Sequence, residues 1–121
     1  MLNTAKTLKT FFSGFGLPAY IENNVPEETP LPYITYPLVE PEWDRQASFY
    51  CQVWWPKRDL TALLETAGEI VSEIGESRII PQNGGYIAIY PETPLIQILT
   101  DEDTDRAYIN MMIRAYHLPG D

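Results

Sequence analysis

The chain contains one histidine, His117, and one cysteine, Cys51. A Ser–His–Asp or Cys–His catalytic arrangement would have to use that histidine. Cys51 is the single available thiol, but it falls on the apolar side of a strand predicted over 48–55, where a cysteine behaves as a small hydrophobic residue. One His and one Cys are also too few for a recognised zinc site. We therefore expect no catalytic residue, no cofactor and no metal site.

Three acidic residues, Asp101, Asp103 and Asp105, alternate as they do at the start of a calcium-binding loop. The sixth position, where such a loop needs glycine, is Arg106, and the twelfth, where it needs a bidentate acid, is Met112. The pattern therefore favours a solvated polar turn between two strands, and leaves only weak cation binding open.

Two segments have the spacing of amphipathic helices. In residues 2–15, the apolar side chains Leu8, Phe11, Phe12 and Phe15 fall on one helical face. A second helix is predicted to follow Asp59, a candidate N-cap, and to end at Gly75. Its apolar stripe comprises Leu60, Leu63, Leu64, Ala67, Ile70, Val71 and Ile74, and its solvated flank carries Glu65, Glu69 and Glu73.

The other elements read as strands joined by short turns. Gly84-Gly85 indicates a turn, because it lacks the Lys-Ser/Thr that follows in a phosphate-binding loop. The strands are predicted at 20–25, 33–36, 48–55, 79–80, 86–90, 95–99 and 107–116. We therefore expect one α+β domain over residues 1–121, with an antiparallel or mixed β-sheet and the two helices packed on one face.

Residues 26–47 are dense in proline and predict an extended arm beside the strand that carries Trp54. Trp54 points away from the core face of that strand. Either the arm folds back over it, or it belongs to a protein-binding surface, where Trp, Tyr and Arg are favoured. The candidate interface residues are Tyr36, Trp43, Arg45, Trp54, Arg58, Tyr108, Arg114 and Tyr116.

The charge balance argues against tight binding to nucleic acid. Eight basic residues face seventeen acidic ones, which gives a formal net charge of -9, and phosphate backbones are bound through Lys and Arg. The sequence contains no run near the roughly 20 apolar residues of a membrane helix. A single cysteine rules out a disulfide framework within the chain. We expect a protein that has no membrane partner and is made in a reducing cytosol.

Four segments carry a family likeness, namely Leu31–Asp44, Tyr90–Gln97, Arg106–Asn110 and Ala115–Pro119. In their amino-acid sequence and in their order they resemble minor structural proteins of tailed phages and prophages of Gram-positive bacteria. Within that set, the chain is similar to the tail terminator, or tail completion, group.

That resemblance implies a sheet with helices on one side and no catalytic residue. It also implies a hexameric ring that caps the tail tube and joins it to the neck under the head. The partners would be other copies of the chain, the tail tube protein and a neck or head-completion protein, in a virion assembled in the host cytoplasm. The chain could stay monomeric in solution until it meets the tube. Genome DNA would only pass through, and an acidic ring would not retain it.

Three alternatives remain open at this point. The first is a head-completion or stopper protein of the neck, which would bind the portal side rather than the tube. The second is a small enzyme that uses paired carboxylates and would need a pocket with acids of perturbed pKa. The third is a cytosolic regulator that binds one host protein.

Overall fold

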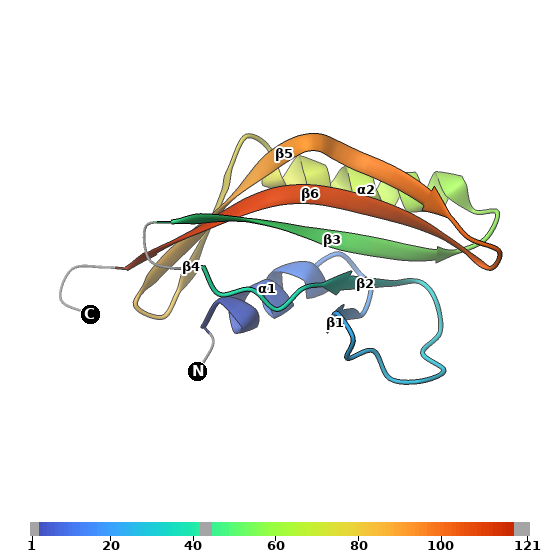
Figure 1. Cartoon of the computed structure of the whole chain (residues 1–121), viewed down its shortest axis with the longest axis horizontal. Coiled ribbons are helices and arrows are strands. Elements are labelled where there is room, and N and C mark those ends of the chain that lie inside the picture. Colours follow the sequence, from blue (N-terminus) through green and yellow to red (C-terminus); the bar gives the residue numbers. More distant parts are fainter. Residues whose placement is uncertain (1–2, 42–44, 118–121) are drawn as a thin grey trace.

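The computed structural model describes residues 3–41 and 45–117 (Figure 1). Six strands form one sheet in the order β1-β2-β3-β6-β5-β4. β1 runs parallel to β2, and the other neighbours are antiparallel, so the sheet is mixed. The elements are α1 (Asn3–Ser13), β1 (Ala19–Ile21), β2 (Tyr33–Tyr36), β3 (Gln46–Pro56), α2 (Leu60–Ile74), β4 (Arg78–Gln82), β5 (Gly85–Thr100) and β6 (Thr104–His117). The predicted α+β class is confirmed.

The two longest neighbours of the sheet, β3 and β6, set which residues are buried. Their register pairs Cys51 with Ile109 and Val53 with Ala107, and all four side chains are fully buried. Because side chains alternate along a strand, every second residue of β6 enters the same core. The predicted apolar face of the last strand is confirmed: Ala107, Ile109, Met111, Ile113 and Ala115 are all buried.

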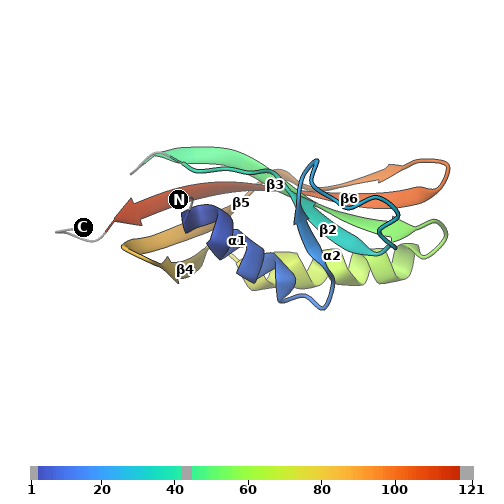
Figure 2. The ribbon, with the colours of Figure 1, turned by 90° about the horizontal axis from the view of Figure 1, so that it is seen from below.

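Both helices pack on that buried face, which leaves the other face without a helix in the described part of the chain (Figure 2). α2 contacts β3, β5 and β6, whereas α1 contacts β1 and β4. Leu63, Ala67, Ile70 and Ile74 of α2, together with Leu8 and Phe12 of α1, are the helix side chains that fill the core.

The structure refines two expectations about α2. Leu60 and Leu64 belong to the apolar stripe of the sequence, yet each is 45% exposed, because the stripe is wider than the strip of helix that meets the sheet. Asp59 occupies the N-cap position, as predicted, but its carboxylate makes no capping hydrogen bond. It accepts a hydrogen bond from Nε1 of Trp55 at 3.4 Å instead. The predicted stop at Gly75 is confirmed, with φ at 57°.

The strands predicted at 86–90 and 95–99 form one element, β5, with a register irregularity between Pro91 and Ile96. β4 pairs only with the first part of β5, up to Ile89. From Tyr90 to Thr100 no described strand pairs with the outer side of β5, so this half is a sheet edge. An edge tolerates proline because the missing N–H is not needed for a second ladder.

Gly68 lies in the interior of α2, where a Cβ built on it would meet no atom within 4 Å. Glycine in a helix interior costs about 1 kcal/mol relative to alanine, because its backbone loses more freedom on folding. We expect Gly68→Ala to raise the free energy of unfolding by about that amount in urea denaturation. Gly75→Ala is the matched control and should lower it, because its positive φ disfavours a side chain. A destabilised Gly68→Ala chain would contradict this reading of α2.

Candidate functional site

The helix-free face of the sheet carries interacting aromatic and arginine side chains from four strands, and we call it the aromatic face. The register places these residues on one side of the sheet, because it pairs Trp54 with both Tyr33 and Arg106, and Tyr86 with Tyr116. Its members are Tyr33 of β2, Tyr50 and Trp54 of β3, Tyr86 and Tyr90 of β5, and Arg106, Tyr108, Arg114 and Tyr116 of β6.

Arg106 holds the centre of one cluster on this face. Its guanidinium carbon lies 4.7 Å from the centroid of the Trp54 ring, a cation–π distance. Nη1 donates to Oε1 of Gln52 at 3.1 Å, and Nη2 forms an ion pair with Asp101 at 3.2 Å. The indole Nε1 of Trp54 donates to Oγ1 of Thr35 at 2.9 Å. Trp54 is therefore fixed by β2 on one side and β6 on the other.

A second cluster joins β3 to the loop after β1. The hydroxyl of Tyr50 donates to the Glu22 carboxylate, with oxygen distances of 2.7 and 2.6 Å. Its ring lies 4.8 Å from the ring of Tyr108 on β6, measured between centroids. Desolvation raises the pKa of the Tyr50 phenol, and the hydrogen bond to Glu22 and the charge of that carboxylate raise it further.

A third cluster lies toward the other end of β6. The rings of Tyr86 and Tyr116 stack with centroids 4.8 Å apart and planes at 21°. Nη1 of Arg114 donates to the hydroxyl of Tyr116 at 3.3 Å, and its guanidinium carbon is 5.9 Å from the same ring. A hydrogen bond with Tyr116 is the main cause that raises the pKa of Tyr90.

Four of the eight candidate interface residues, Trp54, Tyr108, Arg114 and Tyr116, share the aromatic face. Tyr36 does not, and its assignment is wrong: it is fully buried and stacks on Phe12 of α1 with centroids 5.0 Å apart. The expectation placed it on a surface because it lies among prolines. The α1 helix instead covers this part of β2.

The remaining candidates lie elsewhere. Arg45 is exposed just before β3, and Arg58 is exposed in the turn between β3 and α2, with φ at 75°. Trp43 lies outside the described residues. The list of candidate interface residues left out five members of the face, namely Tyr33, Tyr50, Tyr86, Tyr90 and Arg106. Arg106 and Tyr50 alternate with core residues, so the period of two could have found them.

The described part of the proline-rich arm, 26–41 and 45–47, does not lie across Trp54. Its central part is β2, which pairs with β3 as a neighbouring strand and so widens the sheet. The ring of Tyr33 is 6.0 Å from that of Trp54 between centroids, beside it rather than over it. Trp54 is partly exposed as a result. Of the two outcomes that the sequence left open, an accessible tryptophan is the one observed.

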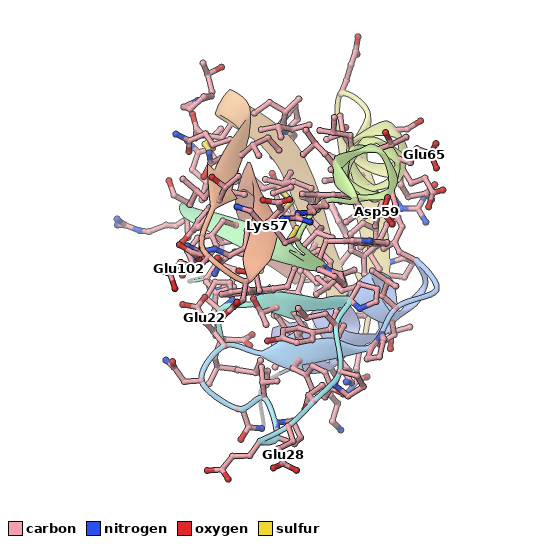
Figure 3. All side chains as sticks on the ribbon, turned by 90° about the vertical axis from the view of Figure 1, so that its right-hand side faces the viewer. Glu22, Glu28, Lys57, Asp59, Glu65 and Glu102 are labelled. Atoms are coloured by element: carbon pink, nitrogen blue, oxygen red, sulfur yellow. The ribbon has the colours of Figure 1, made fainter. Side chains whose placement is uncertain are left out.

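The acidic residues of one end of the molecule surround a lysine. Figure 3 shows Lys57 near the centre of this end, with Glu22 and Glu102 to one side and Asp59 and Glu65 to the other. Nζ of Lys57 lies 3.6 Å from a carboxylate oxygen of Asp105. Two acids of the 101–105 segment, Asp101 and Asp105, are thus paired with cations of the chain, because Arg106 binds Asp101.

Two observations on the described residues concern metal binding and thiol chemistry. Among them, no group of three or more His, Cys, Asp or Glu side chains is placed to hold a metal ion. Cys51 is fully buried, and burial raises the pKa of its thiol, which opposes formation of the nucleophilic thiolate. What the aromatic face can do is bind: it presents ring faces and guanidinium groups that are already held in place.

Comparison with known proteins adds the fold alone. No protein-family model matches the chain, and no match was found among curated proteins. A solved structure of a protein whose name states no function is similar over 97% of this chain and 93% of that one, with a TM-score of 0.61 and 17% sequence identity. No helix in the described residues has both the length and the apolar character to cross a membrane.

Removal of the arginine that bridges β3 to the 101–105 turn should be costly. We expect Arg106→Ala to lower the free energy of unfolding by about 1–2 kcal/mol, because it removes two charged hydrogen bonds and a cation–π contact. The free energy of unfolding of Arg106→Lys should lie between those of the parent chain and Arg106→Ala, since lysine keeps the charge but not the planar group. Urea denaturation measures both. Arg58→Ala, at an exposed turn, is the control, and an equal loss there would refute the role of Arg106.

The Tyr50–Glu22 contact predicts a defined pH dependence. Because the phenol pKa is raised in the folded chain, the contact stabilises the fold while Tyr50 is protonated, and that contribution is lost as pH rises through the folded pKa. We expect Glu22→Gln to lower the Tyr50 pKa toward the ordinary value of about 10. NMR titration of tyrosine Cζ measures this. Glu76→Gln, at an exposed acid after α2, should leave Tyr50 unchanged, and no response to Glu22→Gln would disprove the coupling.

Proposed function

We propose that this chain is a structural protein of the neck or tail of a tailed bacteriophage. In this proposal it forms a ring on the end of the tail tube and joins the tube to the neck proteins below the head. Two things support the proposal. One is the resemblance of four ordered segments to tail terminator proteins. The other is an α+β fold of the kind that the resemblance implies, with helices on one side of the sheet.

The observation that carries the proposal is that the described residues leave two separate surfaces of the sheet uncovered. One is the aromatic face. The other is the outer edge of β5 beyond Ile89, where Ile96, Ile98 and Leu99 are 36%, 38% and 40% exposed. A closed ring needs a heterologous contact, in which one surface of a copy meets a different surface of the next. A chain with two unlike uncovered surfaces meets that requirement.

The β5 edge has the chemistry of a strand-addition site. Its backbone N–H and C=O groups face outward without a partner strand in the described chain, and such an edge pairs readily with another chain. Ile96 and Ile98 pair with Ile109 and Ala107, so they lie on the helix side of the sheet. An added strand would extend this apolar strip.

The acidic character suits a protein that DNA passes without being held. The net charge is -9, and the end of the molecule in Figure 3 is lined by carboxylates. A surface of that sign repels phosphates, so it adds no binding step to the passage of the genome. Such a surface suits a tail terminator and a neck stopper equally.

Electron microscopy of particles that lack this chain tests the proposal. We expect tails of irregular length, or tails that are not joined to heads, because the tube would have no cap. Normal tails of normal length attached to heads would refute it. Mixing the purified chain with tail tubes and, separately, with portal-side particles distinguishes a terminator from a stopper, according to which of the two retains it.

A matched pair of variants tests the β5 edge as the ring contact. Ile98→Lys should prevent ring formation on tubes, because a lysine in an apolar strand contact cannot be desolvated without a partner. Leu38→Lys, at a leucine that is 54% exposed in the arm, should assemble normally. Both variants should unfold at the same temperature as the parent chain. Rings of Ile98→Lys in normal yield would exclude this edge.

A further inference from the structure

An open groove lies between α1, α2 and β4, on the side of the sheet opposite the aromatic face. Its volume is about 1150 Å³. Its apolar lining comes from Phe11, Phe15 and Ile80, which are only partly buried. Pockets for small molecules typically measure roughly 300–1,000 Å³ and enclose their ligand. A larger open groove with an apolar floor is better suited to a segment of polypeptide.

Small residues line both helical walls of this groove. Gly68 and Ser72 lie one turn apart on α2, and Thr10 of α1 and Gly14, directly after its last residue, lie on the opposite wall. Gly68 is the informative one, because no described atom outside its own stretch of helix lies within 4 Å of the Cβ it lacks. Internal packing therefore does not require glycine at a helical position that disfavours it. A close approach by another backbone would require it.

The charges of the groove are unequal on its two sides. Glu65 and Glu69 lie on the α2 wall, and neither forms an ion pair with a described residue, whereas Glu73 is paired with Arg78 at 3.1 Å. On the α1 wall the charged residue is Lys6. An occupant that covers the apolar floor would therefore gain from a positive charge on its α2 side.

We propose that this groove binds a segment of another protein in which apolar or aromatic side chains are flanked by lysine or arginine. The apolar side chains would cover Phe11, Phe15 and Ile80, the basic side chains would meet Glu65 and Glu69, and the backbone would pass close to Gly68. The proposal does not use the phage assignment, because the partner is defined by its chemistry.

A second copy of the chain fits the groove less well. The chain has eight basic residues against seventeen acidic ones, so a second copy offers few basic side chains to Glu65 and Glu69. Three of the basic residues, Lys57, Arg78 and Arg106, are already in ion pairs within the chain. A basic segment of a different protein would supply the positive charge that Glu65 and Glu69 do not receive within the described chain.

The test begins with a displayed library of random linear peptides, selected on the whole chain and counter-selected on the double variant Glu65→Lys/Glu69→Lys. The enriched peptides should combine Lys or Arg with Leu, Ile, Phe, Tyr or Trp. Fluorescence anisotropy of one such peptide should show binding at least about tenfold weaker to the double variant. Glu27→Lys/Glu102→Lys changes the net charge equally at exposed sites outside the groove, and should weaken binding by less than about threefold.

Gly68 supplies a second measurement that separates docking from folding. Gly68→Leu places a good helix former in open space, so the chain should melt no lower than the parent, yet the side chain fills the groove. We expect the same peptide to bind at least about tenfold more weakly to it, with a smaller loss for Gly68→Ala. NMR shift changes on titration of the peptide should centre on Gly14, Gly68 and Glu69.

Several outcomes would overturn the proposal. The selection could enrich acidic peptides or no peptides at all. The two double charge variants could lose peptide affinity equally. Gly68→Leu could bind the peptide as tightly as the parent chain does. Shift changes at the groove that depend on chain concentration without any peptide, and that vanish in Gly68→Leu, would identify the occupant as a second copy instead. None of these results bears on ring formation through the β5 edge, because the two surfaces are tested by different residues.

Discussion

The pairing of β3 with β6 is the constraint on which the rest of the molecule depends. It runs without a break from Gln46 opposite Arg114 to Pro56 opposite Thr104. Because side chains alternate across the sheet, a slip of one residue would move every core side chain to the open face. The same register that places Cys51 beside Ile109 in the core places Trp54 beside Arg106 on the aromatic face. Stability and the candidate binding surface are therefore two results of a single pairing.

The two helices of the described residues cover only one side of this sheet. The side chains of the other face limit their exposure by packing on one another, as Tyr50 does on Tyr108 and Tyr86 on Tyr116. Contacts of this kind are worth about 0.5–1.5 kcal/mol each beyond the area they bury. They also hold the rings in fixed positions before any partner arrives, and a surface whose side chains are already ordered loses less entropy on binding.

The parts of the fold that follow a local period were predictable from sequence, and those that depend on distant partners were not. Alternation along residues 107–116 predicted both faces of β6. The position of Arg106 over Trp54 depends on the register between β3 and β6, which no local sequence pattern indicates. Tyr36 was placed on a surface because prolines surround it, but Phe12, 24 residues earlier in the numbering, stacks on it. The continuity of β5 was not predicted, because its prolines indicate a break between two strands. The strand tolerates them because no described strand pairs with its outer edge there.

The surfaces of this chain lie on different parts of the sheet, and this bears on what the protein can do. The aromatic face and the α1–α2 groove are on opposite sides of one layer, and the open edge of β5 lies in its plane. Three contacts made in three directions do not compete for space. An enzyme gathers its functional groups at one concave site, whereas a protein at a joint between larger assemblies must hold unlike neighbours at once. The distribution of these surfaces, more than any one residue, is the physical support for the proposal that this chain is a connector.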